Sequence, residues 1–275
     1  GWPGSFVESI DAARLLVQDQ GDGVGFDLIV PSLPGFAFSD PPNKPGMHGG
    51  VIAKLMHQLM TGLGYERYGV QGGDWGAVIA TALALQHPES VLGLHLNLIP
   101  SPPRAPEGTT ASEAEREHLA FRDEWEPENL GYYHIQASRP QTLAYAQNDS
   151  PVGLLAWIVE KLWAWSDHDG DLWSTFDRDR VLTNVMLYWL PGRVLSAASI
   201  YYEMNHSETD FLAGRVEVPT GYARFPKEPW GPPRDMVERK WNLVHYSEPP
   251  RGGHFAAMEQ PDLFATEVAA FFRSL

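Results

Sequence analysis

Apolar side chains recur along the chain with two alternating patterns, one typical of helices and one typical of strands. Helical spacing of apolar positions occurs at residues 6–17, 51–63 and 77–85. Short apolar runs typical of strands occur at residues 26–30, 67–71 and 91–96. Ser5 is a candidate cap for the first helix. This alternation predicts a mostly parallel sheet with right-handed crossovers.

The rhythm changes after residue 99. A charged helix is predicted at residues 111–126, and helical stretches rich in Trp, Leu and Tyr follow at 140–165 and 177–202. Strand patterns resume at 215–221 and 243–246, before a last helix at 262–272. We therefore predict an α/β core at residues 1–99 and 215–275, interrupted by an α-helical lid at 100–214.

Composition narrows the functional classes. The chain has 275 residues, a formal net charge of -15 and no Cys. The negative charge argues against nucleic acid or an anionic membrane as partner. The missing Cys excludes disulfides and thiolate metal sites, and no metal-ligand spacing appears, so we expect neither metal nor cofactor. No apolar run approaches the length of a membrane span, about 20 residues.

The first residue is Gly1 rather than Met, and Gly1–Ser5 resembles a loop that leaves a strand. We expect this chain to be part of a longer protein whose first strands precede Gly1. A cytoplasmic location is expected for the chain itself, and a lost anchor or signal stays open. Whether it forms a homodimer is also open.

The most informative motif is Gly72–Gly76, which reads GGDWG between a predicted strand and a predicted helix. It matches the G-x-S-x-G nucleophile elbow with Asp74 in place of Ser. A carboxylate that attacks a saturated carbon forms an ester, which water can hydrolyse. Asp74 therefore favours electrophiles such as epoxides or alkyl halides. The alternative is a turn in which Asp74 merely caps the next helix.

An elbow nucleophile needs a base and an orienting acid, in the chain order nucleophile, acid, His. His254 follows two glycines in the loop after the last predicted strand. Glu228 lies in the loop after the preceding strand and is the candidate acid. Its rivals are three nearby carboxylates, Glu217, Asp235 and Glu238.

At this point the chain resembles a family. The segments that carry the resemblance are GWPGS at 1–5, PSLPGF at 31–36, QGGDWG at 71–76, GYYHIQ at 131–136, NDSPVGL at 148–154, PTG at 219–221, FPKE at 225–228 and RGGHFAAME at 251–259. They resemble the microsomal-type epoxide hydrolases of the α/β-hydrolase fold, essentially end to end. That family's first loop reads His-Gly-Trp-Pro, and here the His is absent.

The resemblance implies roles for named residues. Asp74 matches the nucleophile, His254 the base and Glu228 the acid. Two lid tyrosines that activate the epoxide oxygen match Tyr132 and Tyr201, with Tyr202 as rival to the second. The backbone N–H groups of Trp2 and Trp75 match the oxyanion donors.

The implied reaction opens an epoxide with water to a vicinal diol through an Asp ester, without a cofactor. Such enzymes serve detoxification or secondary-metabolite biosynthesis. Tryptophans of the lid suggest a bulky or aromatic epoxide, or they simply form the lid core; these are Trp157, Trp163, Trp165 and Trp189. Two alternatives remain: a haloalkane dehalogenase with the same Asp nucleophile, and an inactive hydrolase scaffold that binds a ligand and holds His254 far from Asp74.

Overall fold

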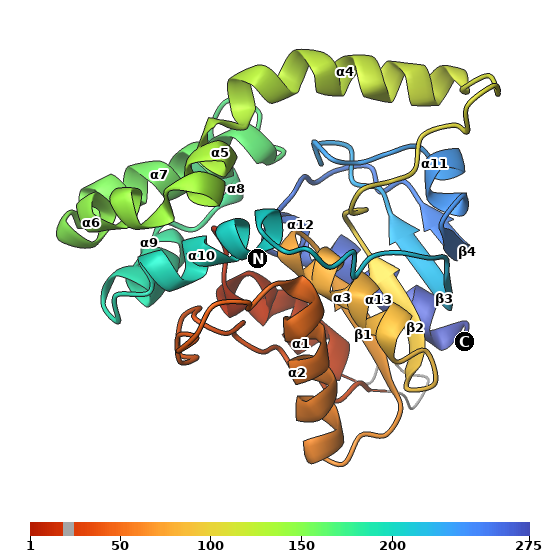
Figure 1. The fold of residues 1–275 in the computed structure, drawn as a ribbon, viewed down its shortest axis with the longest axis horizontal. Helices are drawn as coiled ribbons and strands as arrows, with labels where there is room; N and C mark the ends of the chain where they lie inside the picture. Colours follow the sequence, from red (N-terminus) through yellow and green to blue (C-terminus); the bar gives the residue numbers. More distant parts are fainter. Residues whose placement is uncertain (19–24) are drawn as a thin grey trace.

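The computed structural model describes residues 1–18 and 25–275, and its centre is a four-stranded parallel sheet (Figure 1). The strands are β1 (Tyr68–Gly72), β2 (Val91–Leu96), β3 (Val216–Ala223) and β4 (Trp241–Ser247), hydrogen-bonded in the order β1-β2-β3-β4. Leu94 and Leu96 of β2 are fully buried. The predicted parallel sheet is therefore present, with the elbow strand at its edge.

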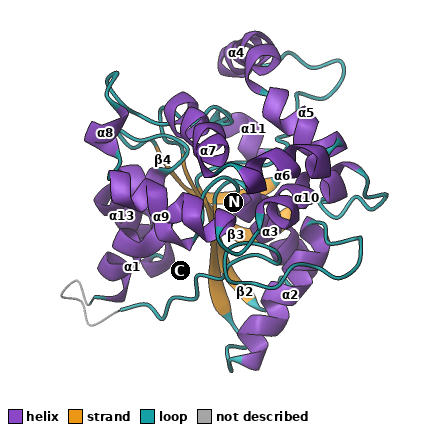
Figure 2. Ribbon diagram, turned by 90° about the vertical axis from the view of Figure 1, so that its left-hand side faces the viewer, coloured by secondary structure: helices purple, strands orange, loops and turns teal. Residues whose placement is uncertain are grey.

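Helices cover both faces of this sheet (Figure 2). The core helices are η1 (Phe6–Ser9), α1 (Ile10–Val17), α2 (Gly49–Gly62), α3 (Trp75–Gln86), α11 (Arg234–Glu238), α12 (Ala256–Glu259) and α13 (Pro261–Arg273). On one face α3 packs against β1 and β2 and is covered by α2. On the other face α13 lies against β2 and packs on α1. This layering is that of an α/β fold.

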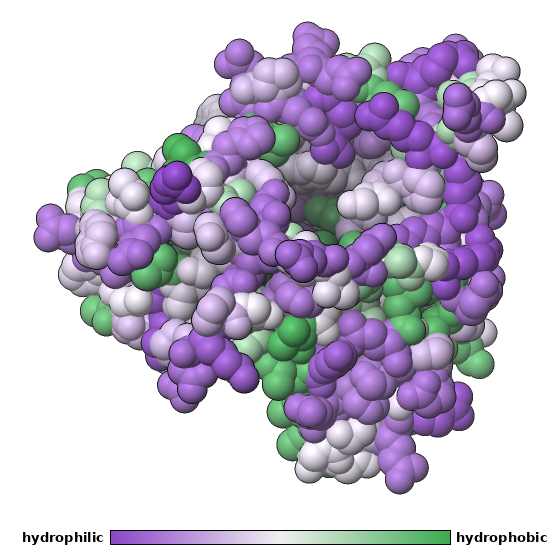
Figure 3. All heavy atoms as spheres, in the orientation of Figure 1, coloured by the Kyte–Doolittle hydropathy of each residue, from purple (hydrophilic) through white to green (hydrophobic). Residues whose placement is uncertain are grey.

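Between β2 and β3 the chain is helical. The helices are α4 (Glu113–Asn129), α5 (Gly131–Ser138), α6 (Pro140–Asp149), α7 (Pro151–Trp165), α8 (Leu172–Thr175), α9 (Arg178–Trp189) and α10 (Val194–Asn205). They lie beside the sheet, with α4 extended along the top of Figure 1. The surface between the sheet and these helices is hollowed, and an apolar side chain forms the floor of the hollow (Figure 3). The bounds proposed for core and lid remain a prediction.

Each long helical stretch of the lid is broken once, which the apolar spacing did not indicate. Ser150 ends α6 and caps α7, because its hydroxyl accepts a hydrogen bond from the Gly153 N–H at 3.1 Å. Pro151 occupies the first turn of α7, where its missing N–H costs nothing. The second break, between α9 and α10, contains Gly192 with a φ of 66°. Proline and glycine thus set helix ends inside an uninterrupted apolar pattern.

The predicted strand at residues 26–30 is wrong. These residues are not in a strand, and the Phe26 N–H donates to the Leu16 carbonyl oxygen at 3.2 Å. A strand requires a neighbour that pairs its backbone groups, and among the described residues this segment has none. The outer edge of β1 likewise lacks a partner strand there.

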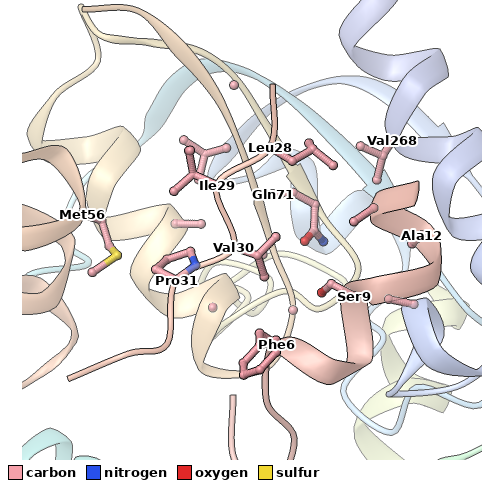
Figure 4. A pocket seen from close by; sticks show the side chains of 18 of the residues that line it. Phe6, Ser9, Ala12, Leu28, Ile29, Val30, Pro31, Met56, Gln71 and Val268 are labelled. Atoms are coloured by element: carbon pink, nitrogen blue, oxygen red, sulfur yellow. The ribbon is translucent and has the colours of Figure 1, made fainter. Parts of the chain in front are cut away.

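A cavity of about 840 Å³ is lined by both the 26–30 segment and β1. Figure 4 shows Ile29 and Val30 of the segment around it, together with Gln71 of β1. Ile29 and Val30 are 39% and 44% exposed. An apolar run can therefore be strand-like in sequence yet remain unpaired when no ladder reaches it.

Candidate active site

The elbow places Asp74 between β1 and α3. Its backbone has a φ of 50° and a ψ of -132°, a conformation that few non-glycine residues adopt. A Cβ on Gly72 would lie 2.4 Å from the Gly76 carbonyl oxygen, so this turn requires glycine. The Asp74 side chain makes no capping hydrogen bond to α3, which contradicts the alternative of a simple helix cap.

His254 joins two carboxylates from different loops. Its Nε2 lies 3.3 Å from Oδ2 of Asp74, and its Nδ1 lies 2.8 Å from Oε2 of Glu228. The side chains of His254 and Glu228 are 2% and 0% exposed. The other Glu228 oxygen accepts from the Trp230 N–H at 3.0 Å. This order of contacts is the one a nucleophile, base and orienting acid require.

The three rival acids are engaged elsewhere. Glu217 pairs with Arg215, Asp235 with Arg239, and Glu238 with Arg234. The predicted trio is thus brought together in register, which an inactive scaffold with His254 far from Asp74 would not do.

His254 lies between two carboxyl groups, and these affect its pKa. Burial alone would lower the pKa of His254, but the carboxylates of Glu228 and Asp74 outweigh it and raise that pKa to about 10. Burial acts to raise the pKa of Asp74, whereas the neighbouring His254 and the Trp75 N–H act to lower it. At neutral pH His254 therefore carries its proton in the resting site. Asp74, beside it, is held in its ionised form.

Both predicted lid tyrosines lie close to the elbow. The ring of Tyr201 on α10 is 4.7 Å from that of Trp75, and the ring of Tyr132 on α5 is 5.9 Å from that of Tyr201. Trp2 stacks on Tyr132 at 5.6 Å. Tyr202, the rival to Tyr201, is 38% exposed and stacks on His206. Of the adjacent pair, Tyr201 is the one that faces the site.

The tyrosine hydroxyls hold their protons at neutral pH. Burial, and then the charge of Asp74, raises the pKa of Tyr132 well above 10. Burial also raises the pKa of Tyr201 well above 10, with Tyr132 and Asp74 acting in the same direction. Each hydroxyl can therefore donate a hydrogen bond to a developing oxyanion without ionising beforehand.

The predicted oxyanion donors are near the elbow in different ways. The Trp75 N–H lies beside the Asp74 carboxylate and contributes to lowering its pKa. Trp2 is buried at 3% exposure and packs its ring on both lid tyrosines. An oxyanion role for the N–H of Trp2 stays a prediction.

The 840 Å³ cavity reaches Asp74 and His254 at one end. Neither Tyr132 nor Tyr201 is among the described residues that line it. It therefore extends along the edge of β1, away from the activating hydroxyls, and its volume does not measure the size of a substrate.

Trp165 was named among the lid tryptophans from the sequence but Trp230 was missed, and both rings lie against His254. The rings of Trp165 and Trp230 lie 5.1 Å and 5.6 Å from the His254 ring. Trp165 also lies 5.2 Å from Tyr132. Of the other lid tryptophans, Trp163 is 51% exposed, and no spacing in the sequence separated it from Trp165.

Residues 1–18 and 25–275 hold no group of three or more His, Cys, Asp or Glu side chains able to bind a metal ion. No helix in the same ranges has both the length and the apolar character needed to cross a membrane.

Known proteins are similar to this chain in sequence and in fold. Residues 1–272 match the family model of the alpha/beta hydrolase fold. A protein of Stigmatella aurantiaca is 41% identical over 280 residues, covering 100% of this chain and 63% of that protein. Epoxide hydrolase 1 of Oryctolagus cuniculus is 37% identical, covering 98% of this chain and 66% of the relative. The chain thus spans slightly less than two thirds of the length of these curated relatives.

Solved structures agree with the sequence relatives. Juvenile hormone epoxide hydrolase from the silkworm Bombyx mori superimposes with a TM-score of 0.84 at 34% identity, over 100% of this chain and 67% of that one. The epoxide hydrolase of Aspergillus niger gives a TM-score of 0.86 at 33% identity, over 100% of this chain and 70% of that one.

Proposed function

Because the chain belongs to the epoxide hydrolase family of the α/β-hydrolase fold, we propose that it opens an epoxide to a vicinal diol through an ester on Asp74. The observation that carries the proposal is the 3.3 Å contact between Asp74 and His254, with Tyr132 and Tyr201 beside the elbow. A carboxylate nucleophile paired with a base and with two acidic hydroxyls suits a strained ether.

In the first step a carboxylate oxygen of Asp74 attacks one carbon of the epoxide ring. The carbon–oxygen bond of the ring breaks, and the oxygen that leaves takes a proton from Tyr132 or Tyr201. The pKa of Asp74 is lower than usual, so its carboxylate is ionised and available as nucleophile at neutral pH. A halide leaving group would need no such acid, so the tyrosine pair supports an epoxide over an alkyl halide.

The first step also changes the base. Ester formation removes the charge of Asp74, which is one of the causes that raise the pKa of His254. That pKa therefore falls, and His254 can give up its proton to the tyrosinate left by the first step. Neutral His254 is then a base held in place by Glu228 at 2.8 Å.

In the second step His254 takes a proton from water, and the resulting hydroxide attacks the carboxyl carbon of the Asp74 ester. The oxyanion is stabilised by the N–H groups of Trp75 and Trp2. Collapse of this intermediate breaks the ester bond, the diol oxygen that leaves takes the proton of the added hydroxyl group, and the Asp74 carboxylate is restored. The proton on His254 restores the resting imidazolium.

The substrate class is a bulky or aromatic epoxide. Trp165 and Trp230 form aromatic walls around His254, which supports a partner with a large apolar group. A cytoplasmic location and a homodimer remain predictions. Analytical sedimentation tests whether the protein is a homodimer.

The test is a single turnover of an aryl epoxide in oxygen-18 water with the protein in excess. The ester route puts the label into the Asp74 carboxylate and leaves the first diol unlabelled. Direct attack by water would put the label into the diol and leave Asp74 unlabelled. Release of chloride from chloroalkanes, without diol formation from epoxides, would favour the dehalogenase instead.

A further inference from the structure

Two carboxylates accept backbone hydrogen bonds across the boundary between the lid and the loop that carries His254. Asp167 follows α7 of the lid, and Glu259 ends α12, which begins two residues after His254. Oε2 of Glu259 accepts the Asp167 N–H at 2.7 Å, and Oδ2 of Asp167 accepts the Gly252 N–H at 2.9 Å. Each carboxylate thus binds the backbone of the other segment. We call Asp167 and Glu259 the carboxylate clamp.

Further hydrogen bonds hold the backbone at His254 and at the residue after it. The second oxygen of Glu259 accepts the Phe255 N–H at 2.9 Å, and the His254 N–H donates to the Trp165 carbonyl oxygen at 2.8 Å. A Cβ on Gly253 would lie 2.5 Å from that carbonyl oxygen, so only glycine allows this approach. The backbone on both sides of His254 is therefore fixed to the end of α7 and to Glu259.

The same end of α7 also supports the acid of the first step. The ring of Trp165 lies 5.1 Å from His254 and 5.2 Å from Tyr132. One short segment, residues 165–167, thus contacts the base through its backbone and an activating tyrosine through a side chain. A shift of this segment would change the distance between the two groups.

The clamp contains a carboxylate in an environment that disfavours charge. Glu259 is 7% exposed, and burial raises its pKa to about 7 against the backbone N–H groups that lower it. Arg251 is the cation beside the clamp, 3.9 Å from Asp167, and its side chain is 59% exposed. Burying a carboxylate such as Glu259 is costly. The clamp carboxylates, however, accept the N–H groups of Asp167, Gly252 and Phe255, a geometry that an apolar side chain cannot reproduce.

We propose that Asp167 and Glu259 are positioning residues that hold His254 in register with the lid for hydrolysis of the Asp74 ester. This inference rests on the proposed function. Neither residue touches the reacting atoms. They act through the backbone of the loop that carries His254.

The experiment separates the two steps by stopped-flow tryptophan fluorescence with an aryl epoxide, using the variants Glu259→Gln and Asp167→Asn. Each amide keeps the size of the side chain but removes one acceptor oxygen. We expect ester hydrolysis to slow about tenfold through misplacement of His254, while ester formation slows less, because Tyr201 remains in place to donate the proton. The double variant should lose less than the product of the single losses, because both residues fix the same junction between the end of α7 and the loop of His254.

Glu115→Gln is the matched control. Glu115 is also buried and accepts a backbone N–H, that of Ala105 at 2.7 Å, but it pairs with Arg239 and lies in the first turn of α4. It should lower the melting temperature without changing the ratio of the two step rates. A purely structural clamp would behave like this control, and equal slowing of both steps in Glu259→Gln and Asp167→Asn would overturn the proposal.

Hydrogen exchange gives a readout that needs no turnover. Amides of residues 165–168 and 252–255 should exchange faster in both clamp variants and at the native rate in Glu115→Gln. Unchanged exchange would refute the clamp even in an active enzyme. Faster exchange in a protein that never forms an ester would instead leave the coupling intact and refute the proposed function.

Discussion

His254 and Asp74 form an ion pair in the resting site, with Nε2 of the imidazolium 3.3 Å from the carboxylate. In the proposed mechanism the nucleophile is therefore also the counterion of the base. Ester formation removes the charge of Asp74 and thereby lowers the pKa of His254. Asp74 therefore acts first, and His254 becomes a base only afterwards.

Replacing His254 by Gln should trap the ester. Asp74 and the two tyrosines remain, so ester formation continues, whereas hydrolysis should slow by at least about 1,000-fold without the base. Intact-protein mass spectrometry after mixing with the epoxide should show the mass of the protein plus one substrate. Absence of that adduct, with the variant folded, would contradict a covalent route.

Removing a tyrosine hydroxyl should act on the other step. Tyr132→Phe and Tyr201→Phe should each slow ester formation about 10- to 100-fold, the worth of a hydrogen bond to a charged oxygen. Stopped-flow fluorescence measures this rate directly. Tyr202→Phe is the control, since Tyr202 is exposed and stacks on His206, and an equal loss in that variant would reject the assignment of Tyr201.

Stability should fall at alkaline pH because of His254. Its pKa is raised from 6.5 to about 10 in the folded protein, so the native state binds this proton more tightly than the unfolded chain. The resulting contribution to the free energy of unfolding is complete below pH 6.5 and is lost as the pH rises through about 10. Urea unfolding across this range measures it, and His254→Gln should lack this part of the decline.

The loop before η1 should depend on its cap. Ser5 accepts the Val7 N–H at 3.3 Å, and burial raises the pKa of Glu8, whose carboxylate also interacts with the Ser5 backbone. Ser5→Ala should lower the free energy of unfolding by about 1 kcal/mol. Thermal and urea unfolding test this, and a change below about 0.3 kcal/mol would show that the cap does not hold this helix.

The contact of Asp74 with His254 was predictable because chemistry and chain order coincide there. Asp74 and His254 follow from the elbow and from the Gly-Gly-His loop, because few other functions need those residues in that order. Tyr201 could not be separated from Tyr202 by sequence, since adjacent helical residues differ only in the face they present. Glu259 was hidden for another reason: its partner Asp167 is 92 positions away, and their contact depends on how the lid meets the core.

The fold was predictable where the local pattern decides the structure. The prediction failed where the structure depends on strand pairing. Residues 91–96 form the predicted strand because β1 and β3 flank them. Residues 26–30 have an equally apolar pattern, yet backbone pairing depends on a neighbour that no local pattern specifies. Apolar spacing alone also could not locate the helix break at Ser150, which a hydroxyl cap and a proline set.

No strand within residues 1–18 and 25–275 pairs with the outer edge of β1, which has a consequence for handling this chain in solution. Unpaired backbone groups beside apolar side chains such as Ile29 and Val30 are a template on which strands of other molecules can add. We expect self-association through that edge to rise with concentration and to be independent of catalysis. Light scattering over a dilution series should therefore show assemblies that dissolve on dilution, and a lysine introduced at Val30 should suppress them.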